Sequence, residues 1–189
     1  QLRTRATIVG NICNASPAGD TIGACILHNG SLKVYGVHGY RDVPLAGFFL
    51  GPGKTALQPG DIVTALHLPL PMPGSAGCYI KLGRNTWSDL SIVGVTALGW
   101  PDSAADSGYG FRIALASVSP TPLEVTSLHE FLAAQPPGPA AFKQAAQLAE
   151  AACSPIDDVR GSARYRKAMV HNLTEKALLK TWRRLQERD

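Results

Sequence analysis

The sequence predicts an α+β protein in which a strand-rich first section precedes an antiparallel sheet that is covered by helices. Two observations lead to this prediction. Three apolar segments follow one another with only polar, Gly-rich connections between them, namely residues 76–82, 91–100 and 111–118. Sequential strands without intervening helices form an antiparallel meander. After residue 123 the apolar residues recur at helical spacing instead.

A proline-rich segment divides the chain. Residues 69–74 hold three prolines at alternate positions, and such a pattern cannot continue the hydrogen-bond ladder of a sheet. We therefore expect two domains, comprising residues 1–71 and 72–189.

The first section reads as loops and strands. Residues 24–28 and 32–37 are apolar runs on either side of Asn29-Gly30, which is a strong signal for a β-hairpin. Residues 48–50 form a short run expected to be buried. Residues 62–68 alternate between apolar and polar side chains, which predicts a strand.

Three helices are expected in the second section. A short one lies within residues 123–134, a second spans the Ala-rich residues 139–153, and a long one spans residues 162–185. In the last, Met169, Leu173, Leu178 and Trp182 share one face. A three-stranded sheet offers one face for these helices to cover.

Composition excludes several classes of protein. The chain has 189 residues, of which 45% are hydrophobic and 17% charged, so it can bury a core, and part of its surface is available to partners. No apolar run approaches the roughly 20 residues that span a bilayer. The four cysteines are too far apart for a CxxC metal motif, and the chain opens without a signal peptide. These features favour a reduced, cytoplasmic protein.

The basic residues are concentrated at one end of the chain. Residues 160–189 hold nine of the 18 Lys and Arg residues. A basic helix could bind nucleic acid or an acidic partner, or it could simply present a solvated face. Because no aromatic residues alternate with these charges, stacking on bases is not indicated, and we expect no nucleic-acid partner.

One segment is dense in small and hydrogen-bonding residues. Residues 7–21 include Gly10, which allows close backbone approach to a ligand, together with short polar side chains that can hold phosphate and ribose. Taken alone, the same segment could be a polar turn. The Gly-Lys-Thr at residues 53–55 lacks the first glycine of a phosphate-binding P-loop, and there is no Rossmann fingerprint.

Residues 7–21 resemble the flavin-binding motif of the molybdenum hydroxylase flavoproteins, the FAD-binding medium subunits of xanthine dehydrogenase and carbon monoxide dehydrogenase-type enzymes. The matching positions are Thr7, Ile8, Gly10, Asn11, Ala15, Ser16, Pro17 and Asp20. Val9 departs from the motif, which has Gly at that position. Residues 48–62, 79–89, 116–122 and 156–162 resemble further segments of the family in the same order, so the likeness covers nearly the whole chain.

The resemblance implies a fold and a set of cofactor contacts. The fold would be the second lobe of a vanillyl-alcohol-oxidase-type (PCMH-type) FAD domain, followed by a three-stranded antiparallel sheet packed on a helical bundle. The cofactor-binding residues would be Thr7, Gly10, Asn11, Asn14, Asp20, Val63 and Lys81. The first four would line the phosphate and ribose side of FAD, and Asp20 would hold a ribityl or ribose hydroxyl.

The remaining two residues would approach the flavin ring. Val63 would pack against the ring system, and the Lys81 cation would stabilise negative charge on the reduced flavin. Without the resemblance, Lys81 would be an ordinary surface Lys at a strand end. No residue is a convincing general base, so we expect neither catalytic side chains nor metal ligands in this chain.

The resemblance also implies partners and an activity. FAD would collect electrons from iron–sulfur clusters on a small subunit and pass them to an external acceptor, while a molybdopterin-binding large subunit oxidises the substrate. Family members begin with a smaller lobe whose Gly-rich loop holds the FAD pyrophosphate, and nothing before Thr7 supplies it. We therefore expect a truncated chain, or a lobe on another chain. The alternative is an assembly or interaction module that does not hold FAD by itself.

Overall fold

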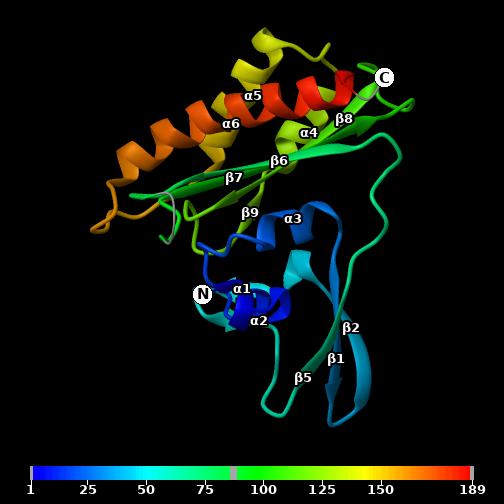
Figure 1. Ribbon diagram of the computed structural model, residues 1–189, viewed down its shortest axis with the longest axis vertical. Helices are drawn as coiled ribbons and strands as arrows, with labels where there is room; N and C mark the ends of the chain where they lie inside the picture. Colours follow the sequence, from blue (N-terminus) through cyan, green and yellow to red (C-terminus); the bar gives the residue numbers. More distant parts are fainter. Residues whose placement is uncertain (1, 86–88, 188–189) are drawn as a thin grey trace.

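The larger of the sheets separates two groups of helices (Figure 1). The computed structural model describes residues 2–85 and 89–187. This sheet is antiparallel, in the order β6 (Ala76–Leu82), β7 (Val93–Pro101), β8 (Tyr109–Ala116) and β9 (Leu123–Glu124). The three expected strands are present, and the two-residue β9 adds a fourth at the edge next to β8. The predicted α+β class and antiparallel meander are confirmed.

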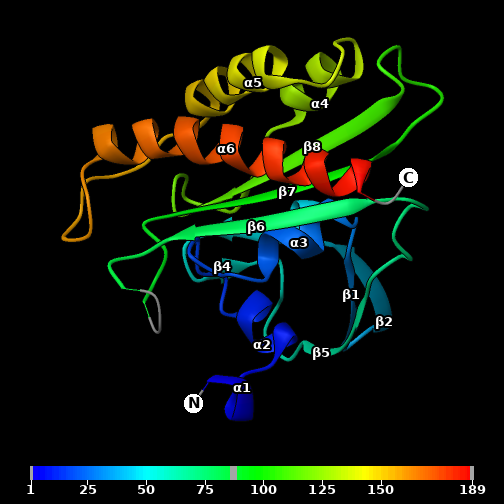
Figure 2. The same cartoon turned by 45° about the horizontal axis from the view of Figure 1, so that its top comes forward.

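The three expected helices cover one face of this sheet (Figure 2). They are α4 (Thr126–Ala133), α5 (Pro139–Ala152) and α6 (Ala163–Gln186). Fully buried Phe111 of β8 meets Phe142 of α5 edge-on, with ring centroids 5.6 Å apart. The Ser162 hydroxyl caps α6 by accepting a hydrogen bond from the Tyr165 amide at 3.2 Å. The helical periodicity in the sequence therefore predicted these elements correctly.

The opposite face of the sheet is covered as well, which the sequence analysis did not anticipate. Helix α3 (Ile22–Leu27) packs there, and Leu27 joins Leu98 and Trp100 in a small core cluster. Gly23 allows this close approach, because a Cβ at that position would lie 2.5 Å from the Thr96 hydroxyl. Strand β7 is buried from Val93 to Trp100 without alternation, as expected for a strand covered on both faces.

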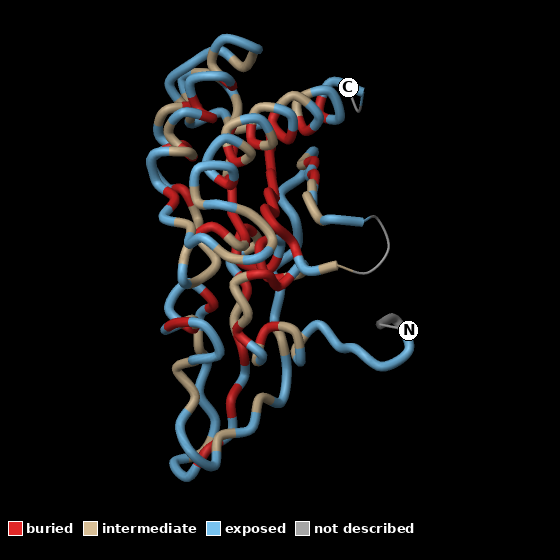
Figure 3. Tube along the Cα trace, turned by 90° about the vertical axis from the view of Figure 1, so that its left-hand side faces the viewer, coloured by how far each residue is buried: buried red, intermediate tan, exposed pale blue. Residues whose placement is uncertain are grey.

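The N-terminal elements form a second sheet with its own core. Strands β1 (Ser31–Gly36), β2 (Gly39–Pro44) and β5 (Ile62–His67) pair antiparallel in the order β2-β1-β5. Around them lie α1 (Leu2–Arg5), α2 (Ile8–Cys13), the 3₁₀ turn η1 (Leu45–Gly47), β3 (Phe49–Gly51) and β4 (Lys54–Thr55). Ile12, Leu32 and Phe48 are fully buried in this core. Figure 3 shows burial densest along the larger sheet and its helices.

The predicted hairpin at Asn29-Gly30 is wrong. Residues 24–28 belong to α3 and its C-terminal cap, and Asn29 takes a left-handed φ of 53° as the helix ends. The Gly30 amide then donates to the Cys25 carbonyl at 2.9 Å. The same tolerance of positive φ that suits Asn-Gly to a hairpin also suits it to a helix C-terminus. The actual hairpin joins β1 to β2 through residues 37–38.

Two other expectations for the first section are confirmed. β5 covers residues 62–67 of the predicted strand. Gly53, with a φ of 66°, lies in the turn before β4, and the next element after β4 is strand β5 rather than a helix. Within the described residues, none of the helices combines the length and apolar character needed to cross a bilayer.

Candidate functional site

Helix α2 presents the first part of the predicted binding segment. The Thr7 hydroxyl caps this helix by accepting a hydrogen bond from the Gly10 amide at 2.9 Å. A Cβ on Gly10 would lie 2.8 Å from that hydroxyl, so a larger residue there would disturb the cap. Both residues are exposed. The structure therefore brings Thr7 and Gly10 together on an open surface where backbone and hydroxyl are accessible.

Asn11 and Asn14 lie further along the same helix and differ in role. The Asn11 side-chain oxygen accepts from the Thr21 hydroxyl at 2.7 Å and from the Thr21 amide at 3.4 Å, which ties α2 to the start of α3. Asn14 is the C-cap of α2, and its side chain is exposed. Asn11 is thus partly committed to the fold, whereas Asn14 remains available to a ligand.

Asp20 and Lys81 form the tightest contact among the predicted residues, although they are 61 positions apart. The Lys81 ammonium lies 2.7 Å from one carboxylate oxygen of Asp20, and the Tyr79 hydroxyl donates to the other at 2.6 Å. The side chains of Lys81 and Asp20 are 30% and 44% exposed. The structure therefore joins the segment after α2 to strand β6 through one carboxylate.

Tyr79 is a member of this group that the sequence analysis did not single out. Burial, and then its hydrogen bond to the Asp20 carboxylate, raise the pKa of the Tyr79 phenol well above its usual range. Alternate residues of a strand point to the same side, so Tyr79 and Lys81 share one face of β6. That period of two was the sequence signal that could have identified Tyr79.

Val63 lies apart from these side chains. It belongs to β5, where it pairs with Val34 of β1, and it packs against the N-terminal core, in a strand that contacts α2. Its side chain is half-buried. The structure thus places Val63 near α2 but in the smaller sheet, whereas Lys81 belongs to the larger one.

A second set of polar contacts fastens residues 17–18 to Ser91, just before β7, and Ser117, just after β8. The Ser117 amide donates to the Pro17 carbonyl at 2.8 Å, and the hydroxyls of Ser117 and Ser91 lie 2.7 Å apart. The Ser91 hydroxyl also points at the Ala18 carbonyl, at 3.4 Å. These contacts hold the loop immediately before Asp20, and they were not predicted from the sequence.

The chemistry of these groups fits a flavin cofactor. An ammonium has three N–H donors, and Lys81 donates one of them to Asp20. The remaining donors and the free lone pairs of the Asp20 carboxylate can bond the carbonyl, imino and hydroxyl groups along a flavin edge. The exposed hydroxyl, amide and backbone groups of α2 supply further short polar contacts. The residues present are therefore able to hold FAD.

Both sections of the chain match known protein families. Residues 1–71 match the family described as the FAD binding domain in molybdopterin dehydrogenase, and residues 77–181 match the CO dehydrogenase flavoprotein C-terminal domain. The chain is 32% identical to the carbon monoxide dehydrogenase medium chain of Hydrogenophaga pseudoflava over 97% of its own length and 63% of the relative's. It is 28% identical to the xanthine dehydrogenase FAD-binding subunit of Escherichia coli O157:H7, over 94% of its length and 61% of the relative's.

The fold agrees with a solved structure of the same kind. Carbon monoxide dehydrogenase from Hydrogenophaga pseudoflava superposes with a TM-score of 0.90 over 97% of this chain and 63% of that chain. The present chain thus spans about three fifths of the length of these relatives. Because the match at residues 77–181 alone covers more than half of it, the chain belongs to the CO dehydrogenase flavoprotein family, and its first section belongs with the FAD binding domain in molybdopterin dehydrogenase.

Proposed function

We propose that this chain forms part of the FAD site of a molybdenum-dependent hydroxylase or dehydrogenase, where FAD receives electrons from iron–sulfur clusters and passes them to an external acceptor. The contact between Asp20 and Lys81 carries this proposal. The resemblance assigned both residues to the flavin from separate parts of the sequence, and they meet at 2.7 Å with donors and acceptors to spare. Two relatives of this chain are the medium chain of carbon monoxide dehydrogenase and the FAD-binding subunit of xanthine dehydrogenase.

Each predicted residue has a proposed role. Those on and beside α2 line the phosphate and ribose side of FAD, because Thr7, Gly10 and Asn14 are exposed and Asn11 is half-buried between them. Asp20 accepts a hydrogen bond from a ribityl or ribose hydroxyl, and Val63 packs against the ring system. The proposed set is Thr7, Gly10, Asn11, Asn14, Asp20, Val63 and Lys81. None of these residues acts as a general acid or base in this proposal.

The electrostatics of the Asp20 group bear on electron transfer. FAD, when bound, can take up one or two electrons and so links one-electron donors to two-electron acceptors. Lys81 places positive charge where the flavin gains negative charge. Asp20 offsets part of that charge, and Tyr79 fixes the orientation of the carboxylate by donating to its other oxygen. The three side chains together set the local field at the proposed ring.

We further propose that the whole enzyme contains a molybdopterin-binding large subunit, an iron–sulfur small subunit and a further FAD lobe. An exposed apolar row on the smaller sheet supports assembly with other chains. Tyr35, Tyr40 and Ile62 face each other across β1, β2 and β5, with exposed fractions of 49%, 63% and 62%. Such rows mark interaction sites.

We also propose that residues 1–71 and 72–189 form two domains of a reduced, cytoplasmic protein with four free cysteines.

A second candidate is an assembly module that does not hold FAD by itself. Two observations favour it: Asp20 and Lys81 already neutralise each other, and Val63 lies in the smaller sheet rather than beside Lys81. The visible spectrum of the purified protein separates the two functions. Flavin absorption bands with FAD close to one per chain, as isolated or after adding FAD, support the FAD site. A protein that stays colourless after incubation with FAD and desalting supports the assembly module.

A further inference from the structure

Strand β6 forms an open edge of the larger sheet. Among the described residues it pairs with β7 alone, so no strand lies along its other side. Figure 2 shows this edge between α6, which lies along one face of the sheet, and α3 on the other face. The edge of a sheet presents unpaired backbone donors and acceptors to any extended segment that lies next to it.

Two hydrogen bonds show which residues of β6 face outward. The Leu82 carbonyl accepts from the amide of Ile92, just before β7, at 2.7 Å, so the backbone of Leu82 faces β7. The Gly77 carbonyl instead accepts from the guanidinium of Arg184 in α6. In an antiparallel pair, the amide and carbonyl of one residue point the same way, and successive residues alternate. The backbone groups at the open edge are therefore those of alternate residues, namely Gly77, Tyr79 and Lys81.

The flank of α6 beside this edge is basic. Arg184 lies there because it contacts Gly77, and Lys180 and Lys176 precede it by four and eight positions, on the same side of the helix. These three cations are exposed, and none of them pairs with a carboxylate in the part of the chain that the structure describes. Residues 176–186 contain no acidic residue. This flank therefore attracts negative charge to the edge.

The spacing of these cations matches that of side chains on an added strand. Helix α6 runs antiparallel to β6, because Arg184 near its end contacts Gly77 near the start of the strand. Arg166, near the beginning of α6, donates to the Ile92 carbonyl beside the end of β6. Residues four apart in a helix rise by ~6 Å, and alternate residues of a strand by ~6.4–6.8 Å. Acidic side chains at alternate positions of an added strand therefore fall opposite successive cations of α6.

The other face of the sheet has an apolar hollow at the same edge. Its volume is about 230 Å³, and its walls include the aliphatic side chains of Ala24, Leu27 and Leu98. Gly77 and Arg184 also line it. Because Arg184 comes from the opposite face, the hollow reaches the open edge of β6. It suits an aliphatic side chain, whose burial there removes apolar surface from water.

We propose that the open edge of β6 receives an extended segment of a partner protein in which acidic and aliphatic residues alternate. The backbone of this segment bonds that of Tyr79 and Lys81. Its acidic side chains face Lys176 and Lys180, and an aliphatic side chain enters the hollow beside Leu27. In this mode of recognition, main-chain hydrogen bonds supply affinity and the alternate side chains supply specificity.

A second copy of the chain fits this edge less well. Pairing β6 with β6 would bring two basic flanks of α6 together, and like charges oppose each other. The inference is also independent of FAD binding, because it uses the backbone of Lys81 and not its ammonium group.

Titration of the purified protein with a peptide tests the proposal. The probe is a peptide of alternating Glu and Val with seven residues, the length of β6. Hydrogen exchange of backbone amides, followed by NMR, is the readout. The amides of Tyr79 and Lys81 should exchange freely in the unbound protein and become protected when the peptide binds, whereas the Ile80 amide, which faces β7, should be protected in both states. A peptide with Lys in place of Glu, or with N-methylated amides on the side that faces β6, should bind at least about tenfold more weakly.

A charge reversal on α6 tests the electrostatic part of the proposal. Lys180→Glu should weaken binding of the Glu peptide about fivefold, since it replaces an attraction between exposed charges by a repulsion. Lys143→Glu is the matched control, because Lys143 is an exposed residue of α5, and it should leave the affinity unchanged.

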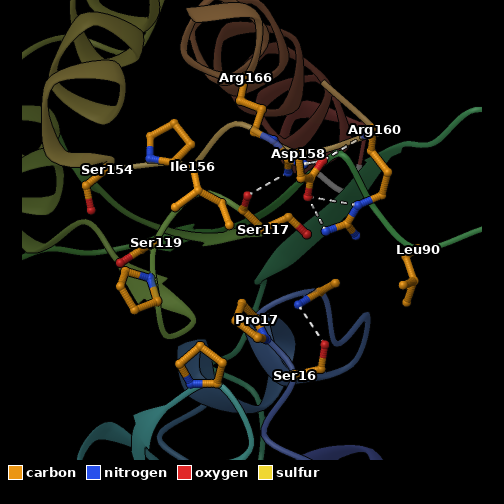
Figure 4. Close-up of a pocket in the computed structure, with 14 residues that line it drawn as sticks. Ser16, Pro17, Leu90, Ser117, Ser119, Ser154, Ile156, Asp158, Arg160 and Arg166 are labelled. Atoms are coloured by element: carbon orange, nitrogen blue, oxygen red, sulfur yellow. Dashed lines mark hydrogen bonds and ion pairs between the residues drawn. The ribbon is translucent and has the colours of Figure 1, made fainter. Parts of the chain in front are cut away.

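A second pair of variants tests the hollow. Ala24→Leu fills it without altering a charge and should weaken the peptide at least about fivefold. Ile156→Ala should have no effect. Ile156 lines a separate pocket beside Asp158, whose carboxylate bonds Arg160 and Arg166, each at 2.6 Å (Figure 4).

The opposite results overturn the proposal. Amides of Tyr79 and Lys81 that are protected without peptide would show that the edge is already occupied, by a second copy if the protein also sediments as a dimer. Equal affinity for the Glu and Lys peptides would exclude the acidic segment, and equal affinity for the N-methylated peptide would exclude strand pairing. If Ala24→Leu does not fold, Lys180→Glu and the peptide series still decide.

Discussion

The Asp20 carboxylate should contribute measurably to stability, because it is the acceptor that links the N-terminal segment to β6. Replacing it by Ala removes the hydrogen bond from Tyr79 and the ion pair with Lys81. A hydrogen bond to a charged group contributes ~1.5–3 kcal/mol when buried. Tyr79 is 39% exposed and the Asp20 side chain 44%, so water screens the bond and ~1–1.5 kcal/mol is the appropriate figure.

The ion pair adds less than the hydrogen bond. Partly exposed pairs contribute ~0.2–1 kcal/mol. Asp20→Ala should therefore lower the free energy of unfolding by about 1.5–2.5 kcal/mol, which corresponds to roughly 3–10 °C in Tm for a chain of this size. Urea denaturation followed by circular dichroism measures the change. Glu150→Ala is the matched control, since the Glu150 carboxylate is 41% exposed and has one partner, His171, at 3.3 Å. It should cost no more than about 0.5 kcal/mol.

A double-mutant cycle isolates the contact itself. Combining Asp20→Ala with Tyr79→Phe should give a coupling energy of about 1 kcal/mol, because each single variant already removes the same hydrogen bond. A coupling within about 0.3 kcal/mol of zero, the usual error for independent sites, would show that Asp20 does not fasten the two segments.

Three further predictions concern stability. Asp158→Ala should lower the free energy of unfolding, measured by urea denaturation, by about 3 kcal/mol, because it leaves the buried Arg166 guanidinium without its counter-ion. A decrease of less than about 1 kcal/mol would refute this prediction. Arg41 lowers the pKa of Asp61 to about 2, and Arg160 and Arg166 lower that of Asp158. These carboxylates therefore stabilise the fold above their unfolded pKa of roughly 3.9. In unfolding titrations, their contribution to the free energy of unfolding should be constant from pH 7 to 5 and should be lost as the pH falls below 4. A free energy of unfolding that stays unchanged down to pH 2 would contradict this prediction. Gly23→Ala should lower Tm through a clash with Thr96 costing ~1–3 kcal/mol, and an unchanged Tm would mean that α3 can move away from β7.

The elements that could be predicted from the sequence are those with a long, consistent pattern. Helices α5 and α6 have apolar residues at helical spacing over many turns, and the three long strands of the larger sheet are mostly apolar runs between polar loops. Helix α2 offered no such pattern. Its sequence contains Ile8, Val9 and Gly10, all weak helix formers, and the helix depends on the Thr7 cap and on burial of Ile12. Those are tertiary and capping effects rather than propensity.

The candidate site was predictable only for residues that belong to a recognisable local sequence segment. The segment at residues 7–21 could be recognised from its composition and its resemblance, and Lys81 came from the resemblance alone. The contact between Asp20 and Lys81 joins positions far apart in the chain, so no local pattern shows it. Asp158 and Arg166 are only eight positions apart, but Asp158 lies in the α5–α6 connection outside any helix or strand, so no helical or strand spacing shows their pairing.

The affinity for FAD of three variants tests the central proposal most directly, namely that Asp20 and Lys81 contact the cofactor. The dissociation constant can be measured by quenching of flavin fluorescence. We expect Asp20→Ala and Lys81→Met each to raise it at least about tenfold, equivalent to roughly 1.4 kcal/mol, and Glu150→Ala to leave it unchanged. Equal affinity in all three variants and the unaltered protein, with the folds intact, would place the flavin elsewhere and contradict the proposed site.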